Sequence, residues 1–452
     1  MKTNFYLFLL ITTGFSLLGS LNVNAQFSLS GQLRTRSELL HGQGSPLSKT
    51  DKPAFFTSQR TRFNAGYKGY RTQFFIAVQD VRVWGQDAST NNRITNPALN
   101  GLMLHEAWGE ISLLDTNQTN LGKEFALKIG RQELLYDDSR LLGNLDWLQQ
   151  ARRHDAALLK YGLNGFTAHI GIAYNQNREL RTGTLYDGVP NGYAAGTNGI
   201  GTMYKSMQFA YLGKKLKQGN VSFLILKDDF QKYAVDSVGV RTVKNGTNKR
   251  VTFGPYLQTK LGKSWNLTAS AYYQAGKDKD GKSLNAYMYS VRGMYGMSKV
   301  FSIGPGFDYT SGTSNGSGKN STFDPLYGTP HKFWGQMDYF YAANGFGKGG
   351  LADFYINSVI KASEKLSIAV DLHQFSSAAN IRNAKDEKLS ANFGEELDII
   401  ATYNLTKTIS FQGGYCTFLP TNSLAQVKAV KDPQKMANWA YLMINIKPEF
   451  LK

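Results

Sequence analysis

Very short links between apolar stretches alternate along this chain with long polar segments, and this regularity limits the folds open to it. Turn-like links fall at 68–70, 162–164, 262–264, 298, 362–365 and 405–407, and somewhat longer ones at 113–123 and 214–219. Between them run the polar segments 39–54, 85–101, 133–151, 176–202, 228–248, 277–284, 310–350, 377–391 and 419–436. Short turns at one end and long loops at the other are typical of an all-β, transmembrane antiparallel β-barrel with short periplasmic turns and long extracellular loops.

The stretches between these links have the alternating hydrophobicity of about eighteen β-strands. We expect them near 27–38, 55–68, 71–84, 102–112, 124–132, 152–160, 165–175, 203–213, 220–227, 249–261, 265–276, 285–297, 299–309, 351–361, 366–376, 392–404, 408–418 and 437–447. A further stretch, 331–342, could be a nineteenth strand, but it would put short and long links out of phase. We therefore expect 310–350 to form one long structured loop, with both chain ends on the periplasmic side.

Charged and apolar side chains fall on opposite faces of the expected strands. In 27–38, for example, Leu29 and Leu33 share one parity, whereas Arg34 and Arg36 share the other. An arginine on the lipid face costs about 2–4 kcal/mol at the membrane midplane, so these arginines are expected to face a wet lumen. A soluble β-sandwich with one solvated face would show the same alternation, but the N-terminal segment and the number of strands favour the membrane.

The first 25 residues have the layout of an export signal. Lys2 gives a positive start, an apolar stretch follows to about Leu18, and Val23 and Ala25 provide the small residues of a signal-peptidase site. The alternative, a membrane-spanning helix, needs about 20 apolar residues, and this stretch is shorter and interrupted. We expect residues 1–25 to be a cleaved signal peptide and residues 26–452 to form one barrel domain in the outer membrane of a Gram-negative bacterium.

Composition favours one barrel over several soluble domains. Aromatic residues make up 13% of the chain and mean hydropathy is −0.34, as expected where only alternate strand positions are apolar. The single cysteine, Cys416, excludes an intramolecular disulfide and is expected to be a small packing residue. The formal net charge of +18 indicates an anionic partner. For an exported chain this partner is lipopolysaccharide outside or an acidic solute inside, and not nucleic acid.

A polar cluster around one strand–loop–strand unit carries a specific resemblance. Residues 128–133 read KIGRQE, residues 137–140 read DDSR, residues 146–147 read DW and residues 151–156 read ARRHDA. Together with QDVRVWG at 79–85, this cluster resembles the alginate-export porin family. The resemblance implies an eighteen-stranded outer-membrane barrel, a monomer, and an anionic uronate polymer as substrate, handled together with a periplasmic secretion assembly.

The same cluster leads to a physical prediction for the channel. Mixed Asp, Arg and Gln at a barrel mouth can hold a loop inward by charge-assisted hydrogen bonds and leave guanidinium groups at a constriction. Arginine matches a carboxylate bidentately, and a ring of positive charge selects anions. The alternative role for any one arginine is to brace the wall by pairing with a lumen carboxylate. We expect the channel-lining positive groups to be Arg34, Arg36, Arg60, Arg62, Arg131, Arg140, Arg152, Arg250 and Arg292, with Asp137, Asp138 and Asp155 as their partners.

Several patterns resemble enzyme motifs but lack the required context. Residues 312–316 match G-x-S-x-G in a polar loop, and 345–350 match G-x-G-x-x-G without a strand–helix unit. Residues 278–281 begin like a calcium loop that has no carboxylate at its twelfth position. The histidines show no metal-ligand spacing. We predict no catalytic residue, no cofactor and no metal site, and hence a transport protein and not an enzyme.

Three functions are compatible with these patterns. The first is a passive, anion-preferring pore that passes acidic oligo- or polysaccharides such as alginate-like uronates outward, or small acidic sugars inward. The second is a structural or adhesive surface barrel, in which the aromatic-rich loop 310–350 plugs the lumen. The third is a general porin without charge preference. The expected partners are an anionic saccharide, outer-membrane lipid with lipopolysaccharide, and the barrel-assembly machinery. That machinery reads a C-terminal aromatic, here Phe450, although Leu451 and Lys452 follow it.

Overall fold

The computed structural model describes residues 26–85, 101–115, 122–186 except 178 and 180, 203–238, 241–314, 318–341 and 347–451. The expected signal peptide, 1–25, and parts of the expected loops 85–101, 176–202 and 310–350 lie outside these described residues. Among the helices of the described ranges, none has the length and apolar character needed to cross a membrane.

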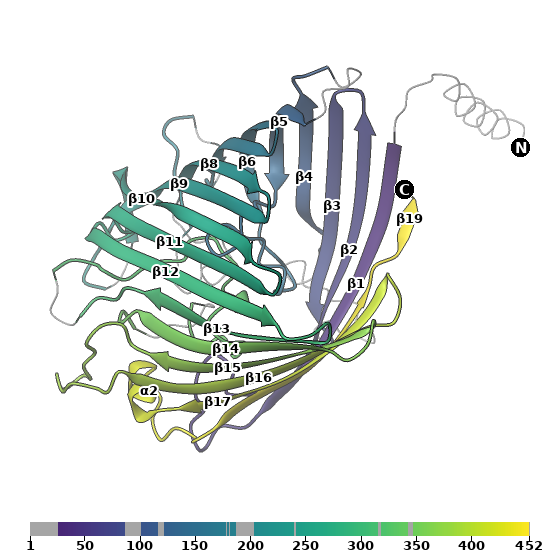
Figure 1. Ribbon diagram of the computed structural model, residues 1–452. Helices are drawn as coiled ribbons and strands as arrows, with labels where there is room; N and C mark the ends of the chain where they lie inside the picture. Colours follow the sequence, from purple (N-terminus) through teal and green to yellow (C-terminus); the bar gives the residue numbers. More distant parts are fainter. Residues whose placement is uncertain are drawn as a thin grey trace, which may run out of the picture.

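Eighteen antiparallel strands pair with their sequence neighbours and form one closed wall, which confirms the predicted β-barrel (Figure 1). Each predicted strand is present. Their bounds are β1 (Gln26–His41), β2 (Ala54–Gly69), β3 (Thr72–Val83), β4 (Met103–Ser112), β5 (Lys123–Gln132), β6 (His154–Leu163), β7 (Phe166–Tyr174), β8 (Ser206–Leu216), β9 (Gly219–Val235), β10 (Arg241–Leu261), β11 (Trp265–Lys277), β12 (Ser283–Gly296), β13 (Phe301–Thr310), β14 (Leu351–Lys361), β15 (Leu366–Ser376), β16 (Asn392–Asn404), β17 (Ile409–Pro420) and β18 (Ala437–Ile446).

The first and last strands close the barrel. β1 pairs with β18 from Leu33 opposite Ile446 to His41 opposite Asn438. The short strand β19 (Glu449–Leu451) then extends the seam, with the Gly31 N–H donating to the Pro448 carbonyl over 2.9 Å. Because β1 also pairs with β2 along its whole length, both of its edges are occupied. Closure of this kind removes the unpaired strand edge that an open sheet would present to lipid.

Two loop predictions need comment. The long segment predicted at 228–248 is wrong in extent, because β9 and β10 continue as a hairpin that pairs up to Val235 opposite Arg241. The polar side chains there hid the pairing, which is made by the backbone. The prediction for 310–350 agrees with its described parts, which hold only the 3-10 helix η3 (Pro330–Lys332) and no wall strand at 331–341.

The wall has two chemically different faces. Outward-facing positions carry exposed apolar side chains such as Phe27, Ile170, Tyr289, Phe354 and Leu442. Inward positions on the same strands carry polar groups, many of them buried beneath loops. Tyr70, Trp84 and Trp265 are exposed near strand ends, where aromatic side chains suit the membrane interface. Trp334 and Trp439 are instead fully buried inside the barrel.

The hydrophobic core of the protein lies inside the barrel. Inward-folded loop residues, including Leu142, Phe323 and Tyr327, form one buried cluster with wall residues such as Met207 and Phe209. A barrel of eighteen strands is too wide for its own wall side chains to fill it. The two loops at 133–153 and 311–350 therefore provide the filling on the side of the long loops.

A substitution on the outer face tests which side of the wall meets lipid. Tyr289→Arg places a charge on an outward position of β12 and should lower the free energy of unfolding by about 2–4 kcal/mol. The matched inward substitution Gln258→Arg should change it by no more than about 0.5 kcal/mol, because that side chain is exposed to water. Urea titration in lipid vesicles, followed by tryptophan fluorescence, measures both. Equal effects would contradict the assignment of the two faces.

Candidate functional site: a lumen narrowed by two loops

Two extracellular loops meet inside the barrel and bind each other through their backbones. Leu142 and Tyr327 form a parallel β-bridge, in which the Gly143 N–H donates to the Tyr327 carbonyl and the Tyr327 N–H to the Leu141 carbonyl, each over 3.0 Å. The Thr329 N–H donates to the Ser139 carbonyl over 2.8 Å. Loop 133–153 and loop 311–350 thus behave as one insert in the lumen.

Glycines permit this close approach. A Cβ at Gly143 would lie 2.4 Å from the Thr329 hydroxyl oxygen, and one at Gly328 would lie 2.0 Å from the Arg140 carbonyl oxygen. The second contact is with backbone, which cannot rotate away. Any side chain at Gly328 would therefore force the two loops apart.

Arginines of β1 and β2 anchor the insert on one side. Asp146 of loop 133–153 accepts from Arg34 over 3.2 Å and from Arg60 over 2.7 Å. Burial raises the pKa of Asp146, but the positive charges of Arg60 and Arg34 outweigh burial and leave that pKa below its usual value. Arg36 donates to the Trp147 carbonyl over 2.7 Å and lies 4.2 Å from the centroid of that indole ring. These three predicted arginines are thus bound to the loop.

Arg140 anchors the insert across the lumen. Its guanidinium donates to Asp308 of β13 over 2.6 Å and to Asp138 over 3.3 Å, and it lies 3.8 Å from the Phe333 ring centroid. Burial lowers the pKa of Arg140, but Asp308 and Asp138 outweigh burial and raise it above its ordinary value. The guanidinium is permanently charged and is fully enclosed by its partners.

Arg250 on β10 makes the third anchor. It binds Asp228 of the neighbouring strand and Asp324 of loop 311–350, and all three side chains are buried. The Tyr327 hydroxyl also donates to Asp228, over 2.7 Å. Burial raises the pKa of Asp324 and the nearby Arg250 partly offsets this. Loop 311–350 is therefore tied to the wall far from the anchors on β1 and β2.

Two further predicted residues complete the anchoring. Arg152 donates to the Gly328 carbonyl, and burial lowers the pKa of Arg152 to about 10. Asp137 accepts from Tyr211 over 3.0 Å and from Ser222 over 2.6 Å, which joins loop 133–153 to β8 and β9. Burial raises the pKa of Asp137. Asp137 therefore binds wall hydroxyl groups and not the arginines expected from the sequence.

Two carboxylates of β16 hold the tip of loop 311–350. Glu396 accepts from the Met337 backbone N–H over 2.7 Å, and Asp398 accepts from the Gln336 N–H over 3.3 Å. Both side chains are buried on the inner face. Sequence reasoning did not select them, because their partners are backbone groups of a loop whose path could not be foreseen. Their i, i+2 spacing on one strand was the available signal.

The remaining predicted residues lie elsewhere. Arg62 is half-buried on the inner face and donates to Gln79 over 2.7 and 2.9 Å. Arg131 and Asp155 form a bidentate pair with each other at 2.8 and 2.9 Å. They occupy the outward parity of β5 and β6, opposite to the buried Gln132 and His154. The expectation that Arg131 and Asp155 line the channel is therefore corrected, because the strand parity turns both toward the outside of the wall.

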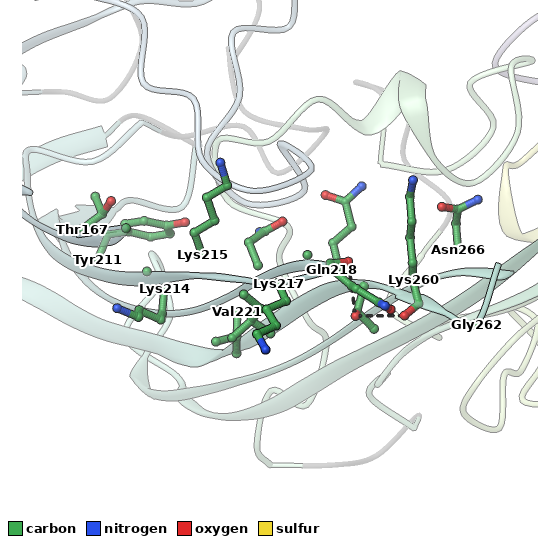
Figure 2. A pocket seen from close by; sticks show the side chains of 17 residues that line it. Thr167, Tyr211, Lys214, Lys215, Lys217, Gln218, Val221, Lys260, Gly262 and Asn266 are labelled. Atoms are coloured by element: carbon green, nitrogen blue, oxygen red, sulfur yellow. Dashed lines mark hydrogen bonds between the residues drawn. The ribbon is translucent and has the colours of Figure 1, made fainter. Parts of the chain in front are cut away.

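Of the exposed, inward-facing cations in the half of the lumen near the short turns, three lie on β8–β12. Arg292, the last predicted arginine, lies on β12, with Lys215 on β8 and Lys260 on β10. In the described part of the chain, none of their side chains makes a hydrogen bond or an ion pair. Figure 2 shows Lys215 and Lys260 pointing to the same side of the wall. Parity could have identified both lysines, since Lys215 follows Phe209 and Lys260 follows Arg250 in steps of two.

The inner face of β4–β6 differs from that of β8–β12, because its lysines have partners. Lys160 pairs with Glu110 over 3.2 Å and with Glu124 over 2.6 Å. Lys128 lies 3.8 Å from the Trp108 ring centroid. Lysines on this side are compensated, whereas Lys215, Lys260 and Arg292 are not. These three side chains therefore leave uncompensated positive charge on the inner face of β8–β12.

One group of side chains has the spacing of a metal site. His105, Glu106 and Glu133 bring their ligand atoms within 4.8 Å of one another. His105 contacts Glu133 at 2.9 Å, and Glu133 also accepts from Asn144 over 2.7 Å. Glu106 accepts from the Glu133 N–H over 3.0 Å. These bonds join β4 to the start of loop 133–153, which gives the group a structural role without a metal.

Arg140 and Arg131 offer a comparison of buried and exposed ion pairs. Arg140→Ala leaves Asp308 buried without its partner, and should lower the free energy of opening loop 133–153 by about 3–5 kcal/mol. Arg131→Ala removes an exposed pair and should change it by about 0–1 kcal/mol. Hydrogen exchange of peptides spanning 138–146, measured by mass spectrometry, gives both values. Equal protection in the two variants would contradict the anchoring role of Arg140.

Lys428, next to the helix α2 (Asn422–Val427), gives a pH-dependent prediction. Its ammonium donates to the Gly44 carbonyl over 2.7 Å and lies 5.2 Å from the Tyr339 ring centroid. Burial lowers the pKa of Lys428 from 10.5 to about 7. The folded protein therefore gains stability as pH rises from 7 toward 10.5, and the full penalty is present below 7. Relative to Lys428→Met, the wild-type Tm should rise over this range; a constant difference would contradict the assignment.

Solved structures with similar folds support the architecture. The crystal structure of Pseudomonas aeruginosa OpdO matches with a TM-score of 0.58 at 11% identity, covering 94% of this chain and 98% of that chain. Acinetobacter baumannii OccAB4 matches with a TM-score of 0.60 at 13% identity, covering 94% and 98%. The outer membrane protein opdK of Pseudomonas aeruginosa gives a TM-score of 0.60 at 9% identity, covering 94% and 99%. At these identities the likeness shows the fold alone. No curated protein sequence matches this chain.

The family resemblance seen in the cluster at 128–156 extends over almost the whole sequence. The family model described as Alginate export matches residues 25–437. Together with the closed eighteen-stranded wall, this match places the chain among outer-membrane pores. The chain belongs to the alginate export family.

Proposed function

We propose that this pore passes acidic oligo- or polysaccharides, such as alginate-like uronates, by passive diffusion, and that it prefers anions. The observation that carries the proposal is the bare positive charge of Lys215, Lys260 and Arg292 on the inner wall. Positive groups that line a narrowed channel raise the local concentration of anions and exclude cations.

Most of the predicted arginines hold the loops in this proposal and do not bind the solute. Arg34, Arg36, Arg60, Arg140, Arg152 and Arg250 are buried and bind loop groups. Their positive charge is largely compensated within the protein. They therefore shape the constriction and do not themselves contact the solute. A permeating uronate would instead meet the exposed cations, with Arg292 able to bind a carboxylate bidentately.

We further propose how the chain reaches this state. Residues 1–25 direct export and are removed, and the barrel-assembly machinery inserts the mature chain as a monomer. The insert is built from loops of a single barrel, which supports a channel formed by one chain. Phe450 lies on β19 at the closing seam, with its ring centroid 6.2 Å from that of Phe63. Lipopolysaccharide is the expected lipid partner, and the positive net charge favours contact with its phosphate groups.

A plugged surface barrel is the second candidate, and one observation favours it. Tyr327, Trp334, Tyr339 and Phe340 of loop 311–350 are buried in the lumen. They fill space instead of forming an exposed surface for sugar stacking. Anchors on β1, β2, β10, β13 and β16 would keep this insert in place.

Ion selectivity separates these functions. In a planar bilayer under a KCl gradient, the refolded protein should show a reversal potential of the sign that marks anion preference. Arg292→Gln should lower the anion-to-cation permeability ratio about fourfold, because a unit charge about 10 Å away in water favours an anion and disfavours a cation by about 0.4 kcal/mol each. The control Lys385→Gln removes the same charge from an exposed extracellular loop and should leave the ratio unchanged.

The other outcomes are equally informative. A cation preference in the wild type would overturn the proposal, and no preference would indicate a general porin. Complete absence of conductance in repeated insertions would favour the plugged barrel.

A further inference from the structure

A recess at the short-turn end of the inner wall combines positive charge with room for a ligand. It has a volume of about 870 Å³ and lies at the turns that join β8 to β9 and β10 to β11. This volume is in the range of small-molecule sites, about 300–1,000 Å³. Because short turns of such barrels face the periplasm, the recess lies at the periplasmic mouth of the lumen.

The side chains of the recess suit an acidic sugar. Figure 2 shows Lys215, Gln218, Lys260 and Asn266 pointing to one side of the wall, away from Lys214. These four groups offer two ammonium ions and two amides as donors. None of the residues that line this recess in the described part of the chain is acidic. A carboxylate placed there meets donors from neighbouring strands without competition from a protein carboxylate.

Tyr211 gives the recess a flat floor. Its hydroxyl donates to Asp137 of loop 133–153 over 3.0 Å, which holds the ring in place. The ring extends over Gly213, where an added Cβ would lie 3.1 Å from a ring carbon. Because this position is a glycine, no side chain separates the Tyr211 ring from the strand beside it. Such a surface suits the flat, apolar face of a sugar ring, as in sites that combine aromatic area with a few placed polar groups.

We infer that this recess is a carboxylate-binding subsite for one end of a uronic-acid oligosaccharide on the periplasmic side of the pore. The inference rests on the proposed function. It adds where the oligosaccharide first contacts the protein and which groups bind its carboxylate. Lysines suit such a site, because a hydrated ammonium on a flexible stem holds a carboxylate less rigidly than a bidentate guanidinium does. Binding that is weak enough to release the ligand is what conduction requires.

Binding of a uronic-acid trisaccharide to the full mature chain in detergent, measured by calorimetry, tests the subsite. The variant Lys215→Gln/Lys260→Gln should bind about tenfold more weakly, because it loses two solvent-exposed charge contacts, each of which contributes about threefold to the affinity. The matched control Lys263→Gln/Lys299→Gln removes the same charge from exposed short-turn positions that do not line the recess, and it should bind within about twofold of wild type. A neutral trisaccharide should bind none of the variants measurably.

Two results would overturn the subsite: equal binding in both double variants, or equal loss in both. The bilayer measurement keeps this separate from the proposed function. If the wild type is anion-selective and Lys215→Gln/Lys260→Gln still binds the trisaccharide normally, the subsite is wrong and the pore proposal stands. If the wild type shows no anion preference and the lysine variant loses trisaccharide binding, the subsite stands and the pore proposal fails.

Discussion

Closure of β1 onto β18 is the constraint on which the other features of this protein depend. In lipid, every backbone N–H and C=O of a strand needs a partner within the protein, and a closed ladder supplies all of them. The seam from Leu33–Ile446 to His41–Asn438 completes this ladder. Once eighteen strands have closed, however, they enclose more space than their own side chains can fill. The lumen is then available for loops, and the inner parity of each strand is available for polar groups.

Buried guanidinium–carboxylate contacts convert this open space into a narrowed passage. Taking Arg140 and Asp308 out of water is costly, and their attraction repays the cost only because further donors and rings surround them. Such contacts are weak arguments for stability, but they fix geometry well. Arg60 and Arg250 bind the insert from β2 and β10, and Arg140 of the insert binds Asp308 of β13, so the loops have a defined position in the lumen.

The sequence was sufficient for the wall but not for the lumen. Strand number and turn order follow from a period-two pattern and from local turn chemistry, so each strand was found. We predicted β9 and β10 too short, because the ends of these strands that lie farthest from the short turns are polar on both faces. Arg34, Arg60 and Arg250 were correctly assigned to the inner face. Their partners were not foreseen, because Asp146 and Asp324 reach them only through the tertiary path of two loops. Arg131 was placed wrongly, although its parity relative to the buried Gln132 indicated the outer face.

The anion preference that we propose requires that the periplasmic half of the lumen attract negative charge. Asn266 lines the recess and can be changed to cysteine after the buried Cys416 is replaced by alanine. Modification rates of this cysteine by anionic and cationic thiosulfonate reagents of similar size measure the local potential directly. We predict faster modification by the anionic reagent, with a difference that becomes smaller as the salt concentration is raised. Equal rates, or faster modification by the cationic reagent, would contradict it.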